Sequence, residues 1–157
     1  MEDYYSAVDA AKLTGITRRQ LDYWVELGMI KPAITAPRGK AGSVKLFDYD
    51  GLFKLSILGG LIKSGFSIQA LRKITEDDFR GTPPEKRPNW WSTRSGPNST
   101  AESSYVKLNL DAIIEAYKEG DLDNWRLLTE HGILYFSLER LDSKLRKKVA
   151  EQKNKKH

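Results

Sequence analysis

The chain has 157 residues, a formal net charge of +5 and 30% charged residues, which suits one ordinary domain or two small ones. It contains no cysteine, so disulfides, thiolate catalysis and cysteine-based metal sites are excluded. Its two histidines, His131 and His157, are too few and too scattered for a histidine metal cluster, and we expect neither a metal nor a cofactor.

The charges are unevenly distributed along the chain. Residues 1–75 carry 11 Lys/Arg against 7 Asp/Glu, residues 76–139 carry 7 against 12, and residues 140–157 carry 8 against 2. Basic ends around an acidic middle are typical of a nucleic-acid-binding head followed by a region with a different role. Random scatter with a solubilising basic tail is the alternative for the last segment.

The first predicted helix lies between Ser6 and Gly15. Ser6 and Asp9 have the spacing of a capping box, in which each side chain accepts a hydrogen bond from the amide of the other residue. Gly15 stands where a glycine commonly ends a helix. The predicted apolar face of this helix consists of Val8, Ala11 and Leu13.

A second capping box, Thr17 with Gln20, begins another short helix. Its predicted buried stripe, at positions i, i+3 and i+4, consists of Leu21, Trp24 and Val25. The side chains left outside are those of Arg18, Arg19, Asp22, Tyr23 and Glu26. This layout is typical of a helix-turn-helix, in which the second helix enters the major groove of DNA by its N-terminal end. A surface helical hairpin with solvated charges is the alternative.

A small β-hairpin is predicted after this helix pair. Pro32 prevents the second helix from continuing, and the loop at residues 38–43 is rich in glycine and positive charge. Residues 44–47 alternate and are β-prone, so they should pair with residues near 33–37. A basic hairpin directly after a helix-turn-helix is a wing. Phosphates that flank the groove are within reach of its basic residues Arg38, Lys40 and Lys45.

A long apolar helix should follow the hairpin, with Asp48 as its cap and Gly65 at its end. Apolar residues on more than one face make it the predicted core of the head. Its Gly59-Gly60 pair costs about 1–2 kcal/mol in helix propensity, which a close helix crossing would offset. Ser67 is expected to cap a further helix, with an apolar side made of Ile68, Leu71 and Ile74.

The helix caps, buried residues and basic residues of the two helices and the hairpin form an ordered sequence motif. It consists of Gly15, Thr17, Arg19, Leu21, Tyr23, Trp24, Gly28, Met29 and Pro32, followed in the hairpin by Lys45, Leu46 and Phe47. Residues 4–75 therefore resemble the DNA-binding head of MerR-type transcription regulators. Asp22 stands at a position that is often arginine in that family. The run Arg-Gln-Leu-Asp-Tyr-Trp at residues 19–24 resembles a bacterial subgroup that carries a small α+β C-terminal module.

The second half lacks the long dimerising helix that effector-responsive members of that family usually carry, because a proline-rich break follows the head. Beyond the break we predict strands at 90–93 and 105–110, a helix from Asp111 to Gly120, a short helix at Trp125, Leu127 and Leu128, a strand at 133–136 and a final helix containing Leu138, Leu141, Leu145 and Val149.

The predicted fold class is mostly α with small β. It comprises a winged helix-turn-helix domain at residues 1–78, a proline-rich linker at 79–88, an α+β dimerisation or effector domain at 89–152 and a disordered basic tail at 153–157.

The candidate DNA contacts belong to the second helix and the wing: Thr17, Arg18, Arg19, Gln20, Tyr23, Arg38, Lys40, Ser43 and Lys45. We expect Arg18 to read a base, since arginine can fork onto guanine O6 and N7, and Arg19 to make phosphate or mixed contacts. Tyr23 can donate its hydroxyl to a phosphate or pack partly in the core. Asp22 can hold a guanidinium or accept from cytosine N4, but an ordinary surface ion pair is the favoured interpretation.

Aromatic residues are concentrated in the second half of the chain. An apolar ligand pocket, as in drug-responsive members of the family, has Trp90, Trp91, Tyr105 and Trp125 as its candidates. A core or a dimer interface is the favoured alternative, because aromatic side chains dominate both. The basic tail from Lys144 to Lys156 can add non-specific attraction to phosphate or simply be solvated.

These features and the resemblance together predict a sequence-specific transcription regulator that binds a palindromic operator as a homodimer, because one head offers few base contacts. The resemblance implies double-stranded DNA as the partner and RNA polymerase as an indirect one. A small-molecule or protein effector, if there is one, is not identifiable. The alternatives are a phage or plasmid architectural or excisionase-like accessory protein, and a module that recruits another protein.

Other classes of protein lack support in the sequence. It contains no nucleophile–base constellation, no phosphate-cradling glycine loop and no metal set, so we predict that the chain is not an enzyme. No apolar run approaches the roughly 20 residues of a membrane span, and the N-terminus has no secretory signal pattern. We therefore expect no membrane association and a cytoplasmic, nucleoid-associated location.

Overall fold

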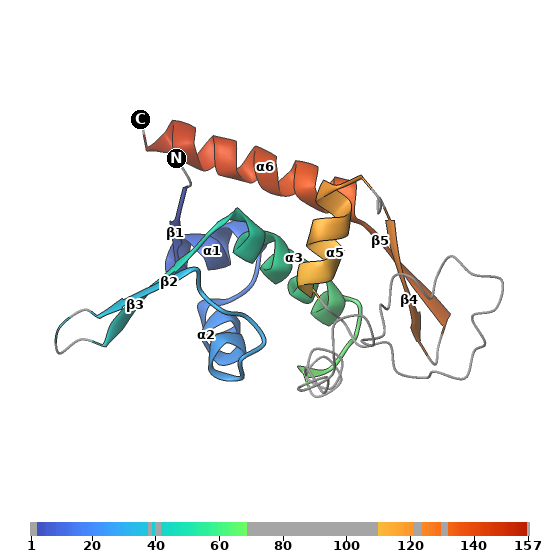
Figure 1. Ribbon diagram of the computed structural model, residues 1–157, viewed down its shortest axis with the longest axis horizontal. Helices are drawn as coiled ribbons and strands as arrows, with labels where there is room; N and C mark the ends of the chain where they lie inside the picture. Colours follow the sequence, from blue (N-terminus) through green and yellow to red (C-terminus); the bar gives the residue numbers. More distant parts are fainter. Residues whose placement is uncertain are drawn as a thin grey trace. The chain divides into compact units, whose positions relative to one another are not determined.

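The computed structural model describes residues 3–37, 39, 42–68, 110–120, 124–129 and 132–156. The chain divides into two compact units, the first made of residues 1–66 and 139–157 and the second of residues 67–138. The first unit is discontinuous in sequence, because a helix near the C-terminus packs with the N-terminal part of the chain (Figure 1). None of the described helices combines the length and the apolar character that crossing a bilayer requires.

The first unit combines helices with a small sheet. Its elements are β1 (Tyr5–Ser6), α1 (Ala7–Thr14), α2 (Arg18–Glu26), β2 (Ile34–Pro37), β3 (Ser43–Phe47), α3 (Tyr49–Lys63) and α6 (Leu138–Lys155). The strands form an antiparallel sheet in the order β1-β3-β2, in which Ile34 pairs with Leu46 and Tyr5 pairs with Phe47. The helices α1, α2 and α3 and the β2–β3 hairpin agree with the sequence predictions. The short strand β1 is an additional element.

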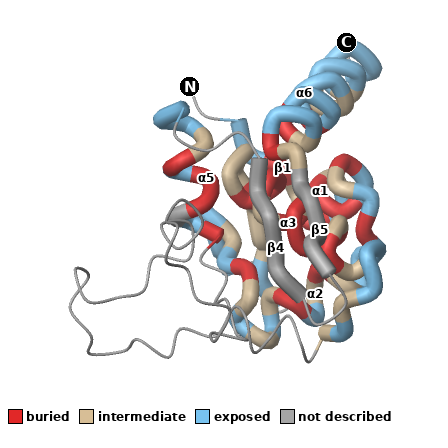
Figure 2. The backbone as a smooth tube through the Cα atoms, turned by 90° about the vertical axis from the view of Figure 1, so that its right-hand side faces the viewer, coloured by how far each residue is buried: buried red, intermediate tan, exposed pale blue. Residues whose placement is uncertain are grey.

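The helix α3 forms the centre of the first unit. It begins after Asp48, whose side chain accepts a hydrogen bond from the Gly51 amide at 2.8 Å, as expected of a cap. Its completely buried residues are Leu52, Leu55, Ile57, Leu58 and Leu61. They lie on more than one face of the helix, as predicted, and Figure 2 shows buried positions concentrated along α3 and α1.

A close crossing occurs where α3 passes the turn between α1 and α2. A β-carbon added to Gly59 would lie 2.9 Å from Cγ2 of Ile16 in that turn. Two carbon atoms do not approach this closely in a packed interior, so the absence of a side chain allows the contact. The predicted compensation for the glycine pair in α3 is therefore present at Gly59.

The buried face of α1 differs from the predicted one. Val8, expected in the core, is 62% exposed. The buried residues of this helix are Ala7, Ala10, Ala11 and Leu13. The prediction for Val8 was wrong because α1 turns its alanine stripe, with helical spacing, toward the core. Small residues on that stripe allow the neighbouring elements to approach closely.

One face of α6 contacts the beginning of α3. The Tyr49 hydroxyl donates to the Asp142 carboxylate at 2.5 Å, and the Asp142 carbonyl lies 3.2 Å away as a second acceptor. Arg146 donates its Nε–H to the same carboxylate at 3.1 Å, and its guanidinium carbon lies 4.9 Å from the centre of the Tyr49 ring. Leu145 is buried on the same side of α6. A nearly buried carboxylate is thus held by donors from both helices.

Ion pairs join the end of α6 to the beginning of the chain. Lys153 contacts Asp3, and Lys156 lies 3.4 Å from Asp9. Lys153 holds the pKa of the Asp3 carboxyl below its usual value, Asp3 raises the pKa of Lys153, and burial raises the pKa of Tyr5. The contribution of the Asp3–Lys153 pair is lost as the pH falls through the lowered pKa of Asp3 or rises through the raised pKa of Lys153. Both side chains are exposed, so this contribution is small.

The C-terminal end differs from its prediction. The sequence predicts a disordered tail at residues 153–157, whereas α6 continues to Lys155 in the structure. The ion pairs with Asp3 and Asp9 supply partners that are remote in sequence. The predicted α+β domain at 89–152 also includes most of α6, but residues 139–157 belong to the first unit.

The described part of the second unit contains one helix and one hairpin. The helix α5 (Leu110–Lys118) agrees with the predicted helix 111–120, and its buried residues are Leu110, Ile113, Ile114 and Ala116. The strands β4 (Asn124–Thr129) and β5 (Gly132–Ser137) pair antiparallel, from Asn124 opposite Ser137 to Thr129 opposite Gly132.

The β4–β5 hairpin agrees with only one of the two predictions made for its residues. The strand at 133–136 agrees with β5, whereas residues 125–128 form part of β4 and the short helix predicted there was wrong. Pairing with β5 satisfies the backbone of β4 and overrides the weak local pattern. The predicted strand at 90–93, residues 105–109 of the strand predicted at 105–110, the linker at 79–88 and the helix beyond Ile68 lie outside the described residues. The prediction for Leu110 was wrong, because this residue begins the helix α5.

Replacing Tyr49 by phenylalanine should lower the free energy of unfolding by about 1–3 kcal/mol, because a hydrogen bond to a carboxylate is lost. Chemical denaturation followed by circular dichroism measures this change. Tyr23→Phe is a matched control, because Tyr23 is 43% exposed and far from this contact in sequence. The control should change the same free energy by less than about 0.5 kcal/mol. Equal losses in the two variants would contradict the stabilising role of the α6 contact.

Candidate nucleic-acid interface

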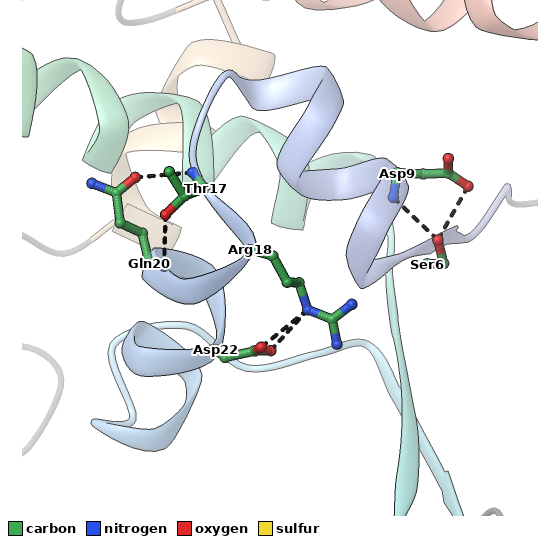
Figure 3. Close-up of polar contacts among 6 residues, drawn as sticks. All are labelled: Ser6, Asp9, Thr17, Arg18, Gln20 and Asp22. Atoms are coloured by element: carbon green, nitrogen blue, oxygen red, sulfur yellow. Dashed lines mark hydrogen bonds and ion pairs between the residues drawn. The ribbon is translucent and has the colours of Figure 1, made fainter.

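Reciprocal hydrogen bonds fix the beginning of α2. The Thr17 hydroxyl accepts from the Gln20 amide at 3.0 Å, and the Gln20 side-chain carbonyl accepts from the Thr17 amide at 3.0 Å (Figure 3). The predicted capping box is therefore present. At α1, Ser6 accepts from the Asp9 amide at 3.1 Å, as predicted, while Asp9 receives the Ser6 hydroxyl at 3.1 Å in place of an amide.

The rotation of α2 is set by its buried residues. Leu21 and Trp24 are completely buried, as predicted, and Val25 is half-buried. The opposite side of the helix is therefore turned toward solvent, where Arg18, Arg19 and Glu26 are exposed. Tyr23 is 43% exposed, which leaves one part of its ring against the protein and another part accessible. Both alternatives for Tyr23, a contact and partial packing, are compatible with this position.

Arg18 makes a bifurcated hydrogen bond to Asp22 on the exposed side of α2. The Nε atom of Arg18 lies 3.1 Å from each carboxylate oxygen of Asp22 (Figure 3). The side chains are 50% and 46% exposed, so the pair is accessible from solvent. The sequence spacing made this pair foreseeable, but it did not show which nitrogen of Arg18 donates.

The β2–β3 hairpin is the wing that the sequence predicts. Figure 1 shows it projecting away from the helices of the first unit. On β3, Ser43 is exposed and Lys45 is half-buried opposite Thr35 of β2. At its end, Gly39 and Gly42 have positive φ angles of 56° and 91°, which glycine adopts without strain. Arg38 and Lys40, which are also candidates, lie outside the described residues.

The helices α2 and α6 lie on opposite sides of α1. Figures 1 and 2, which are related by a rotation about the vertical axis, both place α1 between them. The helix α1 therefore separates α6, which carries the C-terminal lysines, from α2 within the first unit.

The described residues do not include the side chains of the candidate ligand-binding aromatic residues. Trp90, Trp91 and Tyr105 lie outside the described residues, and only the backbone of Trp125, in β4, is placed. The pocket remains a prediction. Within the described ranges, no group of three or more acidic or histidine side chains is arranged to hold a metal ion.

Comparison with known proteins agrees with this arrangement. Residues 5–78 match the model of the MerR HTH family regulatory protein. Uncharacterized HTH-type transcriptional regulators of Mycobacterium bovis and Mycobacterium tuberculosis are 34% identical to the chain over 76 residues. This similarity covers 48% of the chain and 33% of each relative, so the chain matches only a third of their length.

Residues 5–78 are therefore similar to the helix-turn-helix domain of the MerR family, as the resemblance predicts. The matching family and the two relatives are described as regulators.

Replacing Thr17 by alanine should lower the free energy of unfolding by about 0.5–2 kcal/mol, because the Gln20 amide at the beginning of α2 loses its acceptor. Thermal and chemical denaturation measure the change. Thr17→Ser retains the hydroxyl and should remain close to wild type. An alanine variant as stable as the serine variant would contradict the capping role.

Proposed function

We propose that the MerR-family domain at residues 5–78 binds duplex DNA through the N-terminal end of α2 and that the chain regulates transcription. The rotation of α2 is the observation that carries this proposal. Leu21 and Trp24 are buried, which leaves Arg18 and Arg19 exposed on the first turn. Helix-turn-helix proteins insert this end of their second helix into the major groove, where guanidinium groups reach base edges and phosphates.

The wing supports the same proposal. Lys45 and Ser43 on β3 offer a cation and a hydroxyl, both of which are common partners of phosphate oxygens. The backbone of Gly39 and Gly42 has no side chain to prevent a close approach to the sugar–phosphate backbone. Together with Thr17, Gln20 and Tyr23, and with Arg38 and Lys40 as further proposed contacts, the wing would flank the groove that α2 enters.

The regulatory part of the proposal is supported by the relatives, whose names describe transcriptional regulators. We extend it to a homodimer on a palindromic operator, because one short helix reads only a few base pairs. RNA polymerase as an indirect partner, an effector that acts on residues 89–152 and a cytoplasmic, nucleoid-associated location belong to the same proposal.

Replacing Arg19 by alanine should weaken binding to all duplexes and reduce the slope of log affinity against log salt by about 0.9, because one phosphate contact is lost. Fluorescence anisotropy of a labelled duplex between 50 and 200 mM salt, about the range in which such contacts dominate, measures both quantities. Lys144→Ala removes the same charge from the exposed surface of α6 and should leave the slope unchanged. Unchanged affinity and slope in a folded Arg19→Ala variant would count against the proposed interface.

Selection of bound sequences from random duplexes should yield two inverted copies of one short motif, because a two-fold dimer presents two equivalent helices. Their centres should lie about 10 bp or a multiple of one helical turn apart. Light scattering of the complex should give two chains per duplex. A single motif bound by one chain would remove the dimer from the proposal and leave DNA binding in place.

A further inference from the structure

The charges of α2 are arranged against the stability of an isolated helix. Its first turn contains two arginines and no acidic residue, and its last turn contains no basic residue. The helix dipole favours the reverse, with anions near the N-terminus and cations near the C-terminus. Arg18 also precedes Asp22, which is the less favourable direction for an ion pair at this spacing. Helix stability therefore does not explain why these residues stand in this order.

The geometry of the pair leaves the end of the guanidinium available. Arginine has five N–H donors, and the contact with Asp22 uses the one on Nε. Figure 3 shows the two terminal nitrogens of Arg18 pointing away from the carboxylate. Among the described residues, these two nitrogens have no hydrogen-bond acceptor, so their four N–H donors face solvent.

We propose that Asp22 is a positioning residue that orients Arg18 for recognition of a guanine through its two terminal nitrogens. A guanidinium fork matches the O6 and N7 acceptors of guanine in the major groove. Because Nε is held by the carboxylate, the fork must approach the base end-on. The inference rests on the proposed function, since it assigns one base preference to the DNA interface described there.

Asp22 also separates the roles of the two neighbouring arginines. A carboxylate next to Arg18 repels a phosphate, so the contact of Arg18 with the DNA backbone is disfavoured while its contact with a base edge is not. Arg19 has no such acid partner among the described residues and is suited to phosphate. Without the carboxylate, Arg18 can swing to a phosphate or to another acceptor, and the preference for guanine falls.

The alternative is an ordinary exposed ion pair, which would contribute little to stability and nothing to recognition. The two interpretations differ in one measurable quantity, the ratio of affinities for duplexes that differ at one base pair. Asp22→Asn tests this ratio, because it keeps the size of the side chain and removes its charge. Glu26→Gln is the matched control, because Glu26 is an exposed acid at the end of the same helix.

The experiment first selects preferred sequences with the full wild-type chain. It then measures the affinities of each variant for the selected duplex and for duplexes substituted at each base pair. Arg18→Ala should reduce discrimination at one G·C pair by about tenfold or more, the range expected for a bidentate contact. Asp22→Asn should reduce discrimination at the same pair by about threefold or more while binding of the substituted duplexes is retained or strengthened. Glu26→Gln should leave the discrimination unchanged.

A second measurement tests the positioning directly in the free protein. The Arg18 Nε–H should exchange slowly with solvent in wild type and in Glu26→Gln, and rapidly in Asp22→Asn, when observed by NMR. Circular dichroism of each variant establishes that it is folded.

The outcomes separate this inference from the proposed function. A guanine preference that Asp22→Asn or Arg18→Ala leaves intact would overturn the inference alone. A wild-type chain that binds all duplexes equally would overturn sequence-specific binding, and the inference would fall with it. Rapid exchange of the Arg18 Nε–H in wild type would also overturn the positioning role, whatever the DNA preference.

Discussion

The burial of Leu21 and Trp24 is the constraint on which the arrangement of the head depends. The helix that carries them has nine residues, and a helix of this length is not stable alone in water. It forms because one side packs completely against the rest of the first unit, and that packing fixes its rotation. The indole Nε1 of Trp24 is buried without a partner among the described residues, so shape and apolar contact outweigh the cost of one unpaired donor.

The helix α3 provides the support behind this arrangement. At Gly59 it approaches Ile16 so closely that no side chain fits between them, and Ile16 lies directly before the cap of α2. The beginning of α2 is thus positioned from behind by α3 and fixed locally by the Thr17–Gln20 capping box. Rigid placement of the first turn matters because the direction of Arg18 and Arg19 depends on it.

Most of the head was predictable because its signals are local. Capping pairs, helix-ending glycines and the stripe of Leu21 and Trp24 all involve residues within about one or two turns of each other, so their spacing predicts the structure. The prediction that Val8 is buried was wrong although it rested on local spacing, because α1 buries alanines in its place. The pattern shows that a helix has an inner face more reliably than it shows which face that is.

Contacts between residues far apart in sequence were not predictable. Tyr49 and Asp142 are separated by 93 positions, and neither has a neighbour in sequence that indicates the other. The same holds for Lys153 with Asp3, which places the end of α6 beside the N-terminal strand. Strand β4 was mistaken for a helix for a related reason, because its conformation depends on pairing with β5. In the candidate site, the exposure of Arg18 and Arg19 on α2 was predictable from the buried stripe, but the choice of Nε as the donor to Asp22 was not.

The return of α6 makes the second unit an insertion within the first. The chain leaves the first unit after Phe66 and re-enters it at Glu139, so two covalent joints connect the units where a tandem arrangement would have one. Closing a long loop costs entropy that grows slowly, by about 0.6 kcal/mol for each doubling of its length, so an insertion of this size is tolerated. Both ends of the inserted segment are therefore joined to the first unit, one after the end of α3 and the other at the beginning of α6.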